Sequence, residues 1–470
     1  MLPNLKEAKV RTKNKVDIKN YEINPKYKKL GLNKKYYIKT YGCQMNEHDT
    51  ENIKAILEQM EFIETEEMED ADLILLNTCA IRENAHNKVF GMIGRIKHLK
   101  ETKPHIMVGL CGCMAQEEVV IDEIMNRYKW LDIVFGTHNI ANLPQIIDES
   151  LSKKTLAIEV MSVEGDIVEN IPVKRDSKYK AWVNIMYGCD KFCTYCIVPY
   201  TRGKQRSRLP IDIIKEVEQL VEDGYQEVTL LGQNVNAYGK DLEIDYNMAD
   251  LLNDVAKTKI KRIFFVTSHP WDFTPDMIEA IKNNSNVKPY IHLPLQSGSN
   301  EILKKMGRRY TKESYLELFK SLKDNIPNVA ITTDIIVGFP NESDEDFLDT
   351  LEVVNQCKFD SAFTFIFSKR AGTPAALMED NVSLEVKNKR LQTLNKLINK
   401  YSNEANMKYL NKEVEVLIEG VSEKNENILM GYTDTMKLVN VEGAKENIGK
   451  IKKVKITDVK TWSMDGKIVK

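Results

Sequence analysis

The sequence predicts an α/β protein in which two successive blocks of strands and helices precede a small all-β module. Apolar runs alternate with helical segments through most of the chain, which is typical of parallel sheets covered by helices. After Leu410 the pattern changes, and Val414, Val416 and Ile418 alternate with polar residues as in a half-buried strand. At roughly 150 residues per domain, the 470 residues are expected to form about three domains.

The first block repeats a strand followed by a helix. Its first strand is expected over 36–41, and the next apolar positions have the i, i+3, i+4, i+7 spacing of a helix: Ile53, Ile56, Leu57 and Met60. Further strands are expected over 72–77, 105–110 and 132–135. These four strands predict an open parallel sheet with helices packed on it.

Cysteines follow three of these strands. Cys43, Cys79 and the pair Cys111 and Cys113 lie at or just past the carboxyl ends of the strands, where open α/β sheets bind their ligands. We choose Cys113 as the third member because it follows a glycine beyond its strand, as Cys43 does, whereas Cys111 still belongs to the strand. The simpler alternative is a set of inert buried thiols, but three matching positions favour a shared site.

The second block contains six strand candidates separated by helical segments. The strands are expected over 182–187, 228–231, 263–267, 290–293, 331–337 and 362–367. Six such repeats predict a partial barrel, whose chemistry would lie at the carboxyl ends of its strands. A polar stretch over 161–180 predicts a linker before this block, and a charged helix over 384–410 closes it.

The last block is punctuated by Gly431, Gly443, Gly449 and Gly466, which suits short strands and turns. Nine lysines face four acidic residues between Lys437 and Lys470, a local charge of +5. Charge alone does not distinguish a solvated face from the basic surface of a small RNA-binding barrel. Trp462 could stack on an unpaired base or belong to the core of the barrel.

Composition narrows the functional classes. Sixty-seven basic and sixty-nine acidic residues give a net charge of −2, which excludes a uniformly basic nucleic-acid binder and requires any RNA site to be local. No run approaches the roughly 18 to 20 apolar residues of a membrane helix. The basic segment 1–32 lacks the apolar centre of a secretory signal, so we expect a flexible tail and a cytoplasmic location. Cysteines in a reducing compartment favour metal or redox chemistry over disulfides.

The sharpest motif is Cys189-Asp-Lys-Phe-Cys193-Thr-Tyr-Cys196. Three thiolates within eight residues can hold a 4Fe-4S cluster and leave its fourth iron without a protein ligand. Structural zinc would need a fourth ligand, and the next histidine is only at His269. Cys357 lies in a helical segment far from both sets and is expected to be a core residue.

Several motifs together resemble the radical S-adenosylmethionine methylthiotransferases, over 33–470. They are Tyr41-Gly-Cys-Gln-Met-Asn-Glu-His-Asp49, Gly112-Cys-Met-Ala-Gln116, Cys189 through Gly203, Leu230-Leu-Gly-Gln-Asn-Val-Asn-Ala-Tyr-Gly239, His292-Leu-Pro-Leu-Gln-Ser-Gly-Ser299 and Ser368-Lys-Arg-Ala-Gly-Thr373. The residues around Cys43 are similar to those of the MiaB family, which acts on tRNA. The resemblance implies a flavodoxin-like N-terminal domain over 33–150, a linker over 151–174, a radical barrel over 175–407 and a C-terminal TRAM domain over 408–470.

The resemblance also implies a reaction. One molecule of S-adenosylmethionine would donate a methyl group to sulfur on an auxiliary 4Fe-4S cluster, and another would yield the radical that abstracts hydrogen from C2 of an adenine. The substrate would be N6-isopentenyladenosine next to the tRNA anticodon, at position 37. The partners would be tRNA, an electron donor such as flavodoxin or ferredoxin, and a sulfur source, with no membrane involved.

Under this resemblance the metal ligands are two sets of three cysteines. The auxiliary set is Cys43, Cys79 and Cys113, and the radical set is Cys189, Cys193 and Cys196. Contacts to S-adenosylmethionine are expected from Tyr195 beside the cluster and from residues at barrel strand ends: Gly232, Gln233, Ser268, Gln296, Arg308, Asp334 and Gly338. Tyr195 could instead be a core residue, and Arg308 could instead contact RNA phosphate.

Two alternatives remain. The same chemistry could act on threonylcarbamoyl-adenosine of tRNA or on a ribosomal protein side chain, which nucleoside analysis would distinguish. A non-catalytic iron-sulfur RNA-binding protein would show no cleavage of S-adenosylmethionine when reduced.

Overall fold

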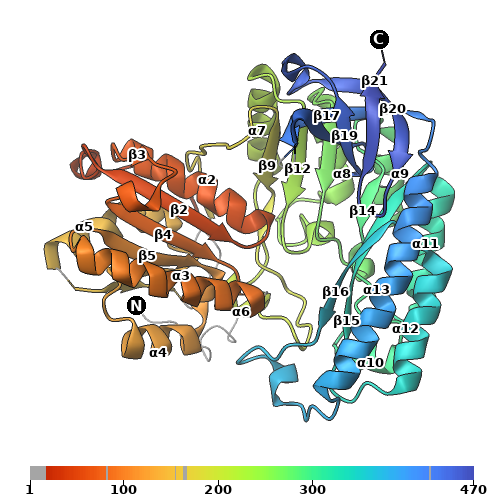
Figure 1. The fold of residues 1–470 in the computed structure, drawn as a ribbon, viewed down its shortest axis with the longest axis horizontal. Coiled ribbons are helices and arrows are strands. Elements are labelled where there is room, and N and C mark those ends of the chain that lie inside the picture. Colours follow the sequence, from red (N-terminus) through yellow and green to blue (C-terminus); the bar gives the residue numbers. More distant parts are fainter. Residues whose placement is uncertain (1–16, 81–82, 154, 162–166, 423–424, 470) are drawn as a thin grey trace. The chain divides into compact units, whose positions relative to one another are not determined.

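The computed structural model describes residues 17–80, 83–153, 155–161, 167–422 and 425–469. These residues form two compact units (Figure 1). The first comprises the described residues of Met1–Asp176 together with Met186–Arg208 and Arg370–Ala376, and the second comprises Ser177–Ile185, Leu209–Lys369 and the described part of Leu377–Lys470. The segment that carries Cys189, Cys193 and Cys196 therefore belongs to the first unit.

The first unit is built on a parallel sheet. Within the described residues the strand order is β3 (Ile63–Glu64), β2 (Lys35–Tyr41), β4 (Leu73–Thr78), β5 (Met107–Gly112), β6 (Ile133–Phe135) and β7 (Ala157–Glu159). Every neighbouring pair in this sheet is parallel. The chain reverses its direction across the sheet between β2 and β4, which is the flavodoxin-like order. The predicted α/β sheet is confirmed.

Helices cover both faces of this sheet (Figure 1). Successive residues of a strand point to opposite faces, so Leu73 and Leu75 of β4 pack with one layer and Ile74 and Leu76 with the other. The first layer contains α2 (Gln44–Gln59) and α5 (Leu143–Lys153), and the second contains α3 (Glu83–Thr102) and α4 (Glu118–Arg127). Each fully buried leucine or isoleucine contributes about 1.5–3 kcal/mol to stability.

The segment before the sheet is ordered where the structure describes it, although the sequence predicted a flexible tail over 1–32. Strand β1 (Ile18–Asn20) pairs in parallel with β8 (Ile167–Glu169) from the expected linker. Tyr21, Ile23 and Leu30 pack against the layer of α2 and α5. For residues 17–32 the expectation was wrong, because charge dominated it while a few spaced apolar residues anchor the segment. Residues 1–16 lie outside the described residues.

The second unit contains the predicted strand-helix repeats. In the described chain, one parallel sheet has the order β13 (Arg262–Phe265), β12 (Glu227–Leu231) and β9 (Lys180–Asn184), and another has the order β14 (Tyr290–His292), β15 (Ala330–Val337) and β16 (Ser361–Ile366). The bridge between Ile263 and Val287 joins β13 to the segment just before β14. The connecting helices are α7 (Pro210–Glu222), α8 (Met248–Lys257), α9 (Pro275–Asn283), α10 (Asn300–Lys305), α11 (Lys312–Asn325) and α12 (Asp344–Cys357), and α13 (Leu384–Met407) follows β16.

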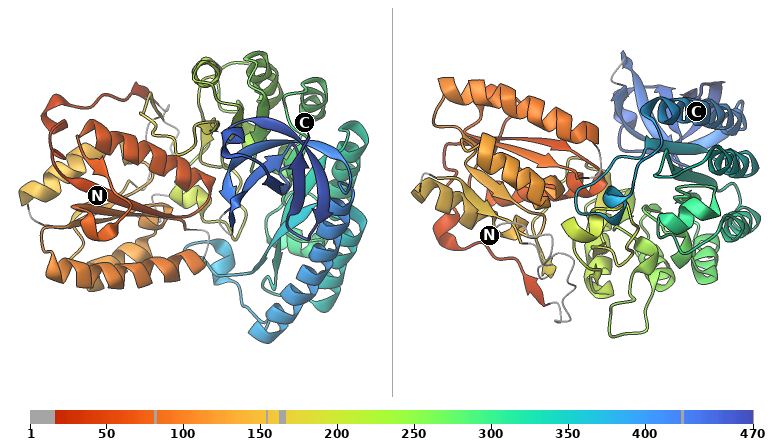
Figure 2. Two further views of the ribbon diagram at one scale, coloured as in Figure 1. Left: turned by 45° about the horizontal axis from the view of Figure 1, so that its top comes forward. Right: turned by 90° about the horizontal axis from the view of Figure 1, so that it is seen from below.

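The C-terminal module is a closed β-barrel (Figure 2). Its strands are β17 (Glu413–Ser422), β18 (Asn425–Thr433), β19 (Leu438–Glu442), β20 (Ile451–Val459) and β21 (Met464–Ile468). Alternate residues such as Val416, Ile418, Val454 and Ile456 form its core. The expected all-β module is confirmed.

This module packs on the amino-terminal ends of the larger barrel's strands. Arg262, at the start of β13, donates hydrogen bonds to the carbonyl oxygens of Tyr432, at 3.1 Å, and Thr433. Its Nε lies 3.3 Å from a carboxylate oxygen of Glu227 and 3.5 Å from one of Asp434. The carboxyl ends of the barrel strands therefore lie away from this contact.

The local excess of lysine at the C-terminus is partly neutralised by pairing. Lys455 and Lys453 of β20 lie opposite Glu413 and Glu415 of β17. Further lysines form ion pairs: Lys460 with Asp465, Lys467 with Glu442, and the buried Lys437 with Asp360. Glu442 and Asp465 already enter the charge of +5 counted over 437–470, so only Glu413, Glu415 and Asp360, which lie outside that range, reduce the basic face further.

No helix in the described part of the chain is both long enough and apolar enough to cross a bilayer.

Candidate functional site

The register of the first sheet aligns three strand ends. Tyr41 of β2 pairs with Thr78 of β4, and Thr78 pairs with Gly112 of β5. Cys43, Cys79 and Cys113 each follow their strand by one or two residues, so the register carries all three thiols to the same edge. Strands β2 and β4 flank the point where the strand order reverses, which is the usual ligand position in this type of sheet.

The three thiols share electrostatic contacts. Cys43 precedes α2, and a hydrogen bond with Cys79 lowers the pKa of the Cys43 thiol to about 6, against the opposing effect of burial and with help from the charge of Arg202. The Nε of Arg202 donates a hydrogen bond to the Sγ of Cys113 at 3.2 Å. Thiolate is the metal-binding form of cysteine, so a cation and a helix N-terminus beside these thiols favour cluster binding.

Cys111 and Cys113 lie in different surroundings. Cys111 is fully buried among Leu75, Ile133 and Phe135 under the α2 and α5 layer, where burial raises the pKa of its thiol. Cys113 instead packs with Ala80, which is next to Cys79. The structure thus brings Cys113, the residue chosen from the sequence, to Arg202 and leaves Cys111 in the core.

Two details of the backbone hold this edge in shape. Gly112 has a φ of +92°, and a Cβ there would lie 2.3 Å from Oδ1 of Asn77 and 2.6 Å from the carbonyl oxygen of Thr78, so only glycine fits. The buried Asn46 and Asn77 side chains connect α2 to β4, with Nδ2 of Asn77 donating to the carbonyl oxygen of Asn46 at 2.8 Å.

The second set of cysteines lies in the loop between β10 (Met186–Tyr187) and β11 (Arg206–Ser207), which pair antiparallel. The N–H of Cys189 donates to the carbonyl oxygen of Gly203 at 3.1 Å, and the N–H of Cys196 donates to that of Cys193 at 3.0 Å. Cys189 and Cys193 are buried and Cys196 is half-buried. The 370–376 segment contacts the loop through a hydrogen bond from Ala375 to Thr194, at 2.8 Å.

The short helix α6 (Val198–Thr201) connects the two cysteine sets within the first unit. Ile197, adjacent to Cys196, and Tyr200 pack with Ala80 and Cys113. Just beyond the helix, the buried Arg202 forms an ion pair with the buried Asp49 at 2.6 Å, in addition to its contact with Cys113. The loop of one set is thereby anchored beside the other set.

A cavity of about 50 Å³ lies beside Arg202 in the same unit. Asp49, His138, Tyr187 and Arg206 are among the residues that line it. Burial lowers the pKa of His138, and the charges of Arg206 and Arg202 act in the same direction. Such a volume holds a few water-sized molecules.

The expected cofactor contacts in the second unit lie near the carboxyl ends of barrel strands. The carbonyl oxygen of Gly232, just past β12, accepts a hydrogen bond from the hydroxyl of Thr267. Thr267, next to the buried Ser268, has a φ of +66°, and Gln296 has a φ of +69°. A positive φ is uncommon for β-branched residues and such strain gathers at functional sites.

The remaining expected contacts are held by neighbours. Arg308 is buried and donates to the hydroxyl oxygen of Tyr310 at 3.0 Å and to the carbonyl oxygen of Pro294 at 3.2 Å. Asp334 lies in the middle of β15, 3.4 Å from Nε2 of His292. Gln233 and Tyr195 are half-buried.

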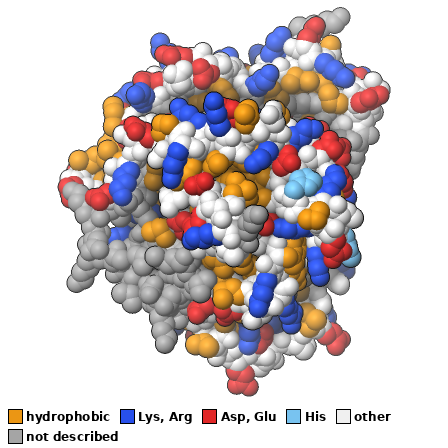
Figure 3. Space-filling model, turned by 90° about the vertical axis from the view of Figure 1, so that its left-hand side faces the viewer, with side chains coloured by type: hydrophobic (Ala, Val, Ile, Leu, Met, Phe, Trp, Pro, Cys, Tyr) orange, Lys and Arg blue, Asp and Glu red, His pale blue; other side chains and the backbone are white. Residues whose placement is uncertain are grey.

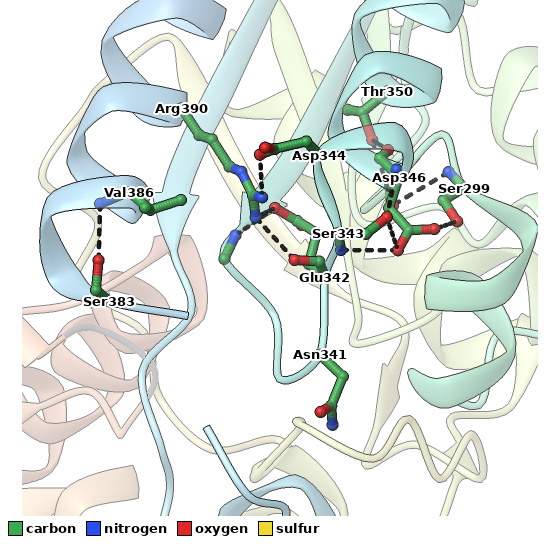
Figure 4. A network of polar contacts seen from close by, with 12 residues as sticks. Ser299, Asn341, Glu342, Ser343, Asp344, Asp346, Thr350, Ser383, Val386 and Arg390 are labelled. Atoms are coloured by element: carbon green, nitrogen blue, oxygen red, sulfur yellow. Dashed lines mark hydrogen bonds and ion pairs between the residues drawn. The ribbon is translucent and has the colours of Figure 1, made fainter. Parts of the chain in front are cut away.

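A polar network fixes Gly338 (Figure 4). The N–H of Gly338 donates to Oε1 of Glu342 at 2.9 Å, and Arg390 of α13 donates to the same oxygen at 2.7 Å. Arg390 also reaches Asp344 at 2.7 Å. The amide of Gly338 is therefore already used, and its Cα packs against the side chain of Lys387.

The donor set fits iron-sulfur clusters better than single ions. No three His, Cys, Asp or Glu side chains of the described residues lie close enough to hold one metal ion. A 4Fe-4S cluster offers a separate iron to each thiolate, so its ligands need not meet at one atom. Two sets of three cysteines within one compact unit suit such clusters.

Four residues that contribute to the site were missed in the sequence. Arg202 and Asp49 stand inside the quoted motifs, but their pairing joins residues 153 positions apart. Thr267 carried no signal, because its positive φ is a property of the folded backbone. His138, which follows the β6 strand end, could have been found from its position alone.

Comparison with protein families gives matches to three parts of the chain. Residues 35–136 match the uncharacterized protein family UPF0004, residues 183–354 match the radical SAM superfamily, and residues 407–469 match the TRAM domain. A tRNA-2-methylthio-N(6)-dimethylallyladenosine synthase of Staphylococcus epidermidis is 56% identical over 469 residues, covering 99% of this chain and 91% of the relative. The Staphylococcus aureus protein of the same name is 56% identical, covering 100% and 91%.

A solved structure has a similar fold. The radical S-adenosylmethionine methyltransferase TsrM from Kitasatospora setae aligns with a TM-score of 0.52 at 13% identity, covering 73% of this chain and 75% of that one.

Proposed function

The chain belongs to the family of the tRNA-2-methylthio-N(6)-dimethylallyladenosine synthases, and on this premise we propose that it adds a methylthio group to C2 of N6-isopentenyladenosine at position 37 of tRNA. It is a transferase of the radical S-adenosylmethionine class, its substrate is tRNA, and its TRAM domain suits RNA binding. Membership of this superfamily implies a 4Fe-4S cluster and S-adenosylmethionine.

We propose that two clusters are bound, one by each set of cysteines. Cys189, Cys193 and Cys196 would hold the cluster that binds S-adenosylmethionine, and Cys43, Cys79 and Cys113 would hold the auxiliary cluster. The observation that carries this proposal is that all six cysteines belong to one compact unit, in which Ile197, Tyr200 and Arg202, just past the second set, contact Cys113 of the first. When bound, the clusters and S-adenosylmethionine supply the radical and sulfur chemistry.

The protein's own residues position and shield these groups. Arg202 places a positive charge beside Cys113, where it offsets the negative charge of the cysteine thiolates. Asp49 orients the guanidinium of Arg202. An adenine C2–H is too weakly acidic for a side-chain base to remove, so no general base is assigned. The hydrophobic surroundings of Cys113 help to exclude water from the auxiliary set.

Contacts to S-adenosylmethionine are proposed for Tyr195 and for seven residues of the barrel, most of them near strand ends. These are Gly232, Gln233, Ser268, Gln296, Arg308, Asp334 and Gly338. The positive φ values at Gln296 and at Thr267, which precedes Ser268, support two of these positions. Because Tyr310 and the carbonyl oxygen of Pro294 already bind Arg308, that residue would reach a carboxylate with only part of its guanidinium.

We also propose domain boundaries for the chain and two further partners. We assign 33–150 to the methylthiotransferase N-terminal domain, 175–407 to the radical barrel and 408–470 to the TRAM domain. An electron donor such as flavodoxin or ferredoxin would reduce the first cluster, and a sulfur source would replenish the second.

Nucleoside mass spectrometry tests the proposed function. We expect tRNA from cells that lack this gene to accumulate N6-isopentenyladenosine and to lose its 2-methylthio derivative, and we expect the cloned gene to restore the derivative. Loss of a methylthio group from threonylcarbamoyl-adenosine would identify that nucleoside as the substrate. Unchanged tRNA with an altered ribosomal protein would identify the protein side chain as the substrate. Absence of S-adenosylmethionine cleavage by the reduced protein would support a non-catalytic RNA binder.

A further inference from the structure

Two phenylalanines of β16 are exposed although their strand is covered on its other face. Phe363 is 57% and Phe365 is 40% exposed. Thr364, between them, donates a hydrogen bond to Oδ1 of Asn395 on α13 at 2.6 Å. Because neighbouring side chains of a strand point to opposite faces, Phe363 and Phe365 point away from α13, which runs along the other side of β16 (Figure 1).

The face of the sheet that carries Phe363 and Phe365 continues across β15 and β14. Asp334 pairs in register with Phe363, and Ile336 pairs with Phe365. His292 of β14 meets Phe363 edge to face, with the ring centroids 6.4 Å apart. The face therefore combines apolar surface from Phe363, Phe365 and Ile336 with one polar corner.

The polar corner is held rigidly. Nε2 of His292 lies 3.4 Å from Oδ2 of Asp334, and its Nδ1 lies 3.0 Å from the hydroxyl of Thr332. Thr332 also donates to the hydroxyl oxygen of Tyr290 at 3.3 Å. Both ring nitrogens of His292 are thus occupied, and its ring stands fixed against Phe363. Such a preorganised apolar seat loses little entropy when a ligand binds.

From this arrangement we infer that Phe363 and Phe365, with Ile336, form the seat for the five-carbon isopentenyl group of the substrate adenosine. This inference rests on the proposed function and adds the residues that select the prenylated base. The occupant follows from the face itself, which offers branched and aromatic surface to an apolar group of a few carbons. It adjoins imidazole and carboxylate groups that suit the polar edge of a purine, and the named relatives act on a dimethylallyl adenosine.

Binding of two RNA hairpins by the full-length protein, with its clusters reconstituted, tests the inference. One hairpin carries N6-isopentenyladenosine at position 37 and the other carries adenosine. One methylene in an apolar pocket is worth roughly 10- to 200-fold in discrimination, so we expect the unaltered protein to prefer the prenylated hairpin at least about tenfold. The double variant Phe363→Ala/Phe365→Ala should lose this preference to within about threefold.

Matched variants separate this role from a structural one. Phe363→Leu/Phe365→Leu should keep most of the preference, since apolar volume is retained. Leu348→Ala removes another exposed apolar side chain, on α12 and 62% exposed, and should leave the preference unchanged. Equal weakening of both hairpins by the double alanine variant, or an unchanged preference, would overturn the inference.

A second measurement uses the unaltered protein, so it does not depend on the folding of a variant. A hairpin whose prenyl chain carries a photoreactive diazirine should crosslink within 361–366 or at Ile336, and crosslinks confined to residues outside this seat would contradict the inference. If the unaltered protein forms no methylthio product and shows no preference, the proposed function fails. If product forms and the double variant keeps its preference, only this inference fails.

Discussion

At the scale of single residues, Cys111 and Cys113 show how the position of a cysteine relative to the end of its strand determines what its thiol contacts. The two cysteines are separated only by Gly112, yet one faces the core and the other faces Arg202. Gly112 with its positive φ turns the chain between them, so both thiols are buried but only that of Cys113 lies against the guanidinium of Arg202.

Alanine substitution at these two positions makes a matched pair. Cys113→Ala should lower the iron content of the reconstituted protein by about half and abolish methylthio transfer, because one of the two proposed clusters loses a ligand. It should leave some cleavage of S-adenosylmethionine. Cys111→Ala should keep both activities and cost on the order of 1 kcal/mol of stability for the cavity it leaves. Iron analysis and product assays measure these effects, and inactivity of Cys111→Ala with normal folding would reverse the assignment.

Arg202 is the residue whose importance depends most on its neighbours. It is buried, and its charge is balanced by Asp49 on α2 while its Nε faces Cys113. A buried ion pair adds little net stability, but removing one partner leaves an uncompensated charge. The pair therefore fixes the position of the loop that carries one cysteine set relative to the strands that carry the other.

At the scale of elements, helix α2 connects the site to the segment before the second unit. Lys54 forms ion pairs with Glu64 and Asp176, and Glu51 accepts a hydrogen bond from the N–H of Asp176 at 3.2 Å. Glu51 lies 3.8 Å from Arg175. Burial raises the pKa of Glu51 to about 7, against the opposing charge of Arg175.

This raised pKa makes stability depend on pH. The folded state keeps the proton of Glu51 up to about pH 7, whereas the unfolded chain loses it near 4.5. Stability from this group is therefore full below the unfolded pKa and is lost as the pH rises toward the folded value. We compare the free energy of unfolding in urea of Glu51→Gln with that of the unaltered protein. The difference in favour of the variant should grow by on the order of 2 kcal/mol from pH 4.5 to pH 7.5. Glu404→Gln, at an exposed position of α13, should show no such gain, and a constant difference across the range would contradict the prediction.

Strands β1 and β8 show a second feature of element scale. Each has three residues, too few for a sequence signal, and in the described chain the two form a sheet of their own. Arg208 then covers β8 from the cysteine loop, with an Nε to Oε1 distance of 2.7 Å to the buried Glu169.

At the scale of the whole molecule, charge is mixed rather than segregated. On one face of the molecule, acidic and basic side chains alternate with apolar ones, as Figure 3 shows. This agrees with the net charge of −2, and in the C-terminal module lysines lie opposite Glu413 and Glu415 or pair with Asp360 of the larger barrel. Trp462, 56% exposed there, is not a core residue, so the alternative of a core tryptophan was wrong.

The contact between the TRAM module and the larger barrel depends on Arg262. Arg262→Met would leave the buried Glu227 and the half-buried Asp434 without their common cation, and we expect a loss of about 3–5 kcal/mol. The module should then separate from the barrel, so limited proteolysis should cut faster near residues 408–412. Lys257→Met, which removes an exposed ion pair with Asp254, is the control. Unchanged proteolysis of the Arg262 variant would show that other contacts hold the module.

The sequence by itself determined the order of the strands along the chain, the three blocks and the cysteine motifs. These are local properties: apolar periodicity sets strands and helices, and a spacing such as that from Cys189 to Cys196 fits within one loop. Folding decided the rest. The register that aligns Tyr41, Thr78 and Gly112, the pairing of Arg202 with Asp49 and the anchoring of residues 17–32 join positions far apart in the chain, so no local pattern carries them. Which side chains a lysine or a thiol meets depends on backbone geometry and burial, and these exist only once the sheets have formed.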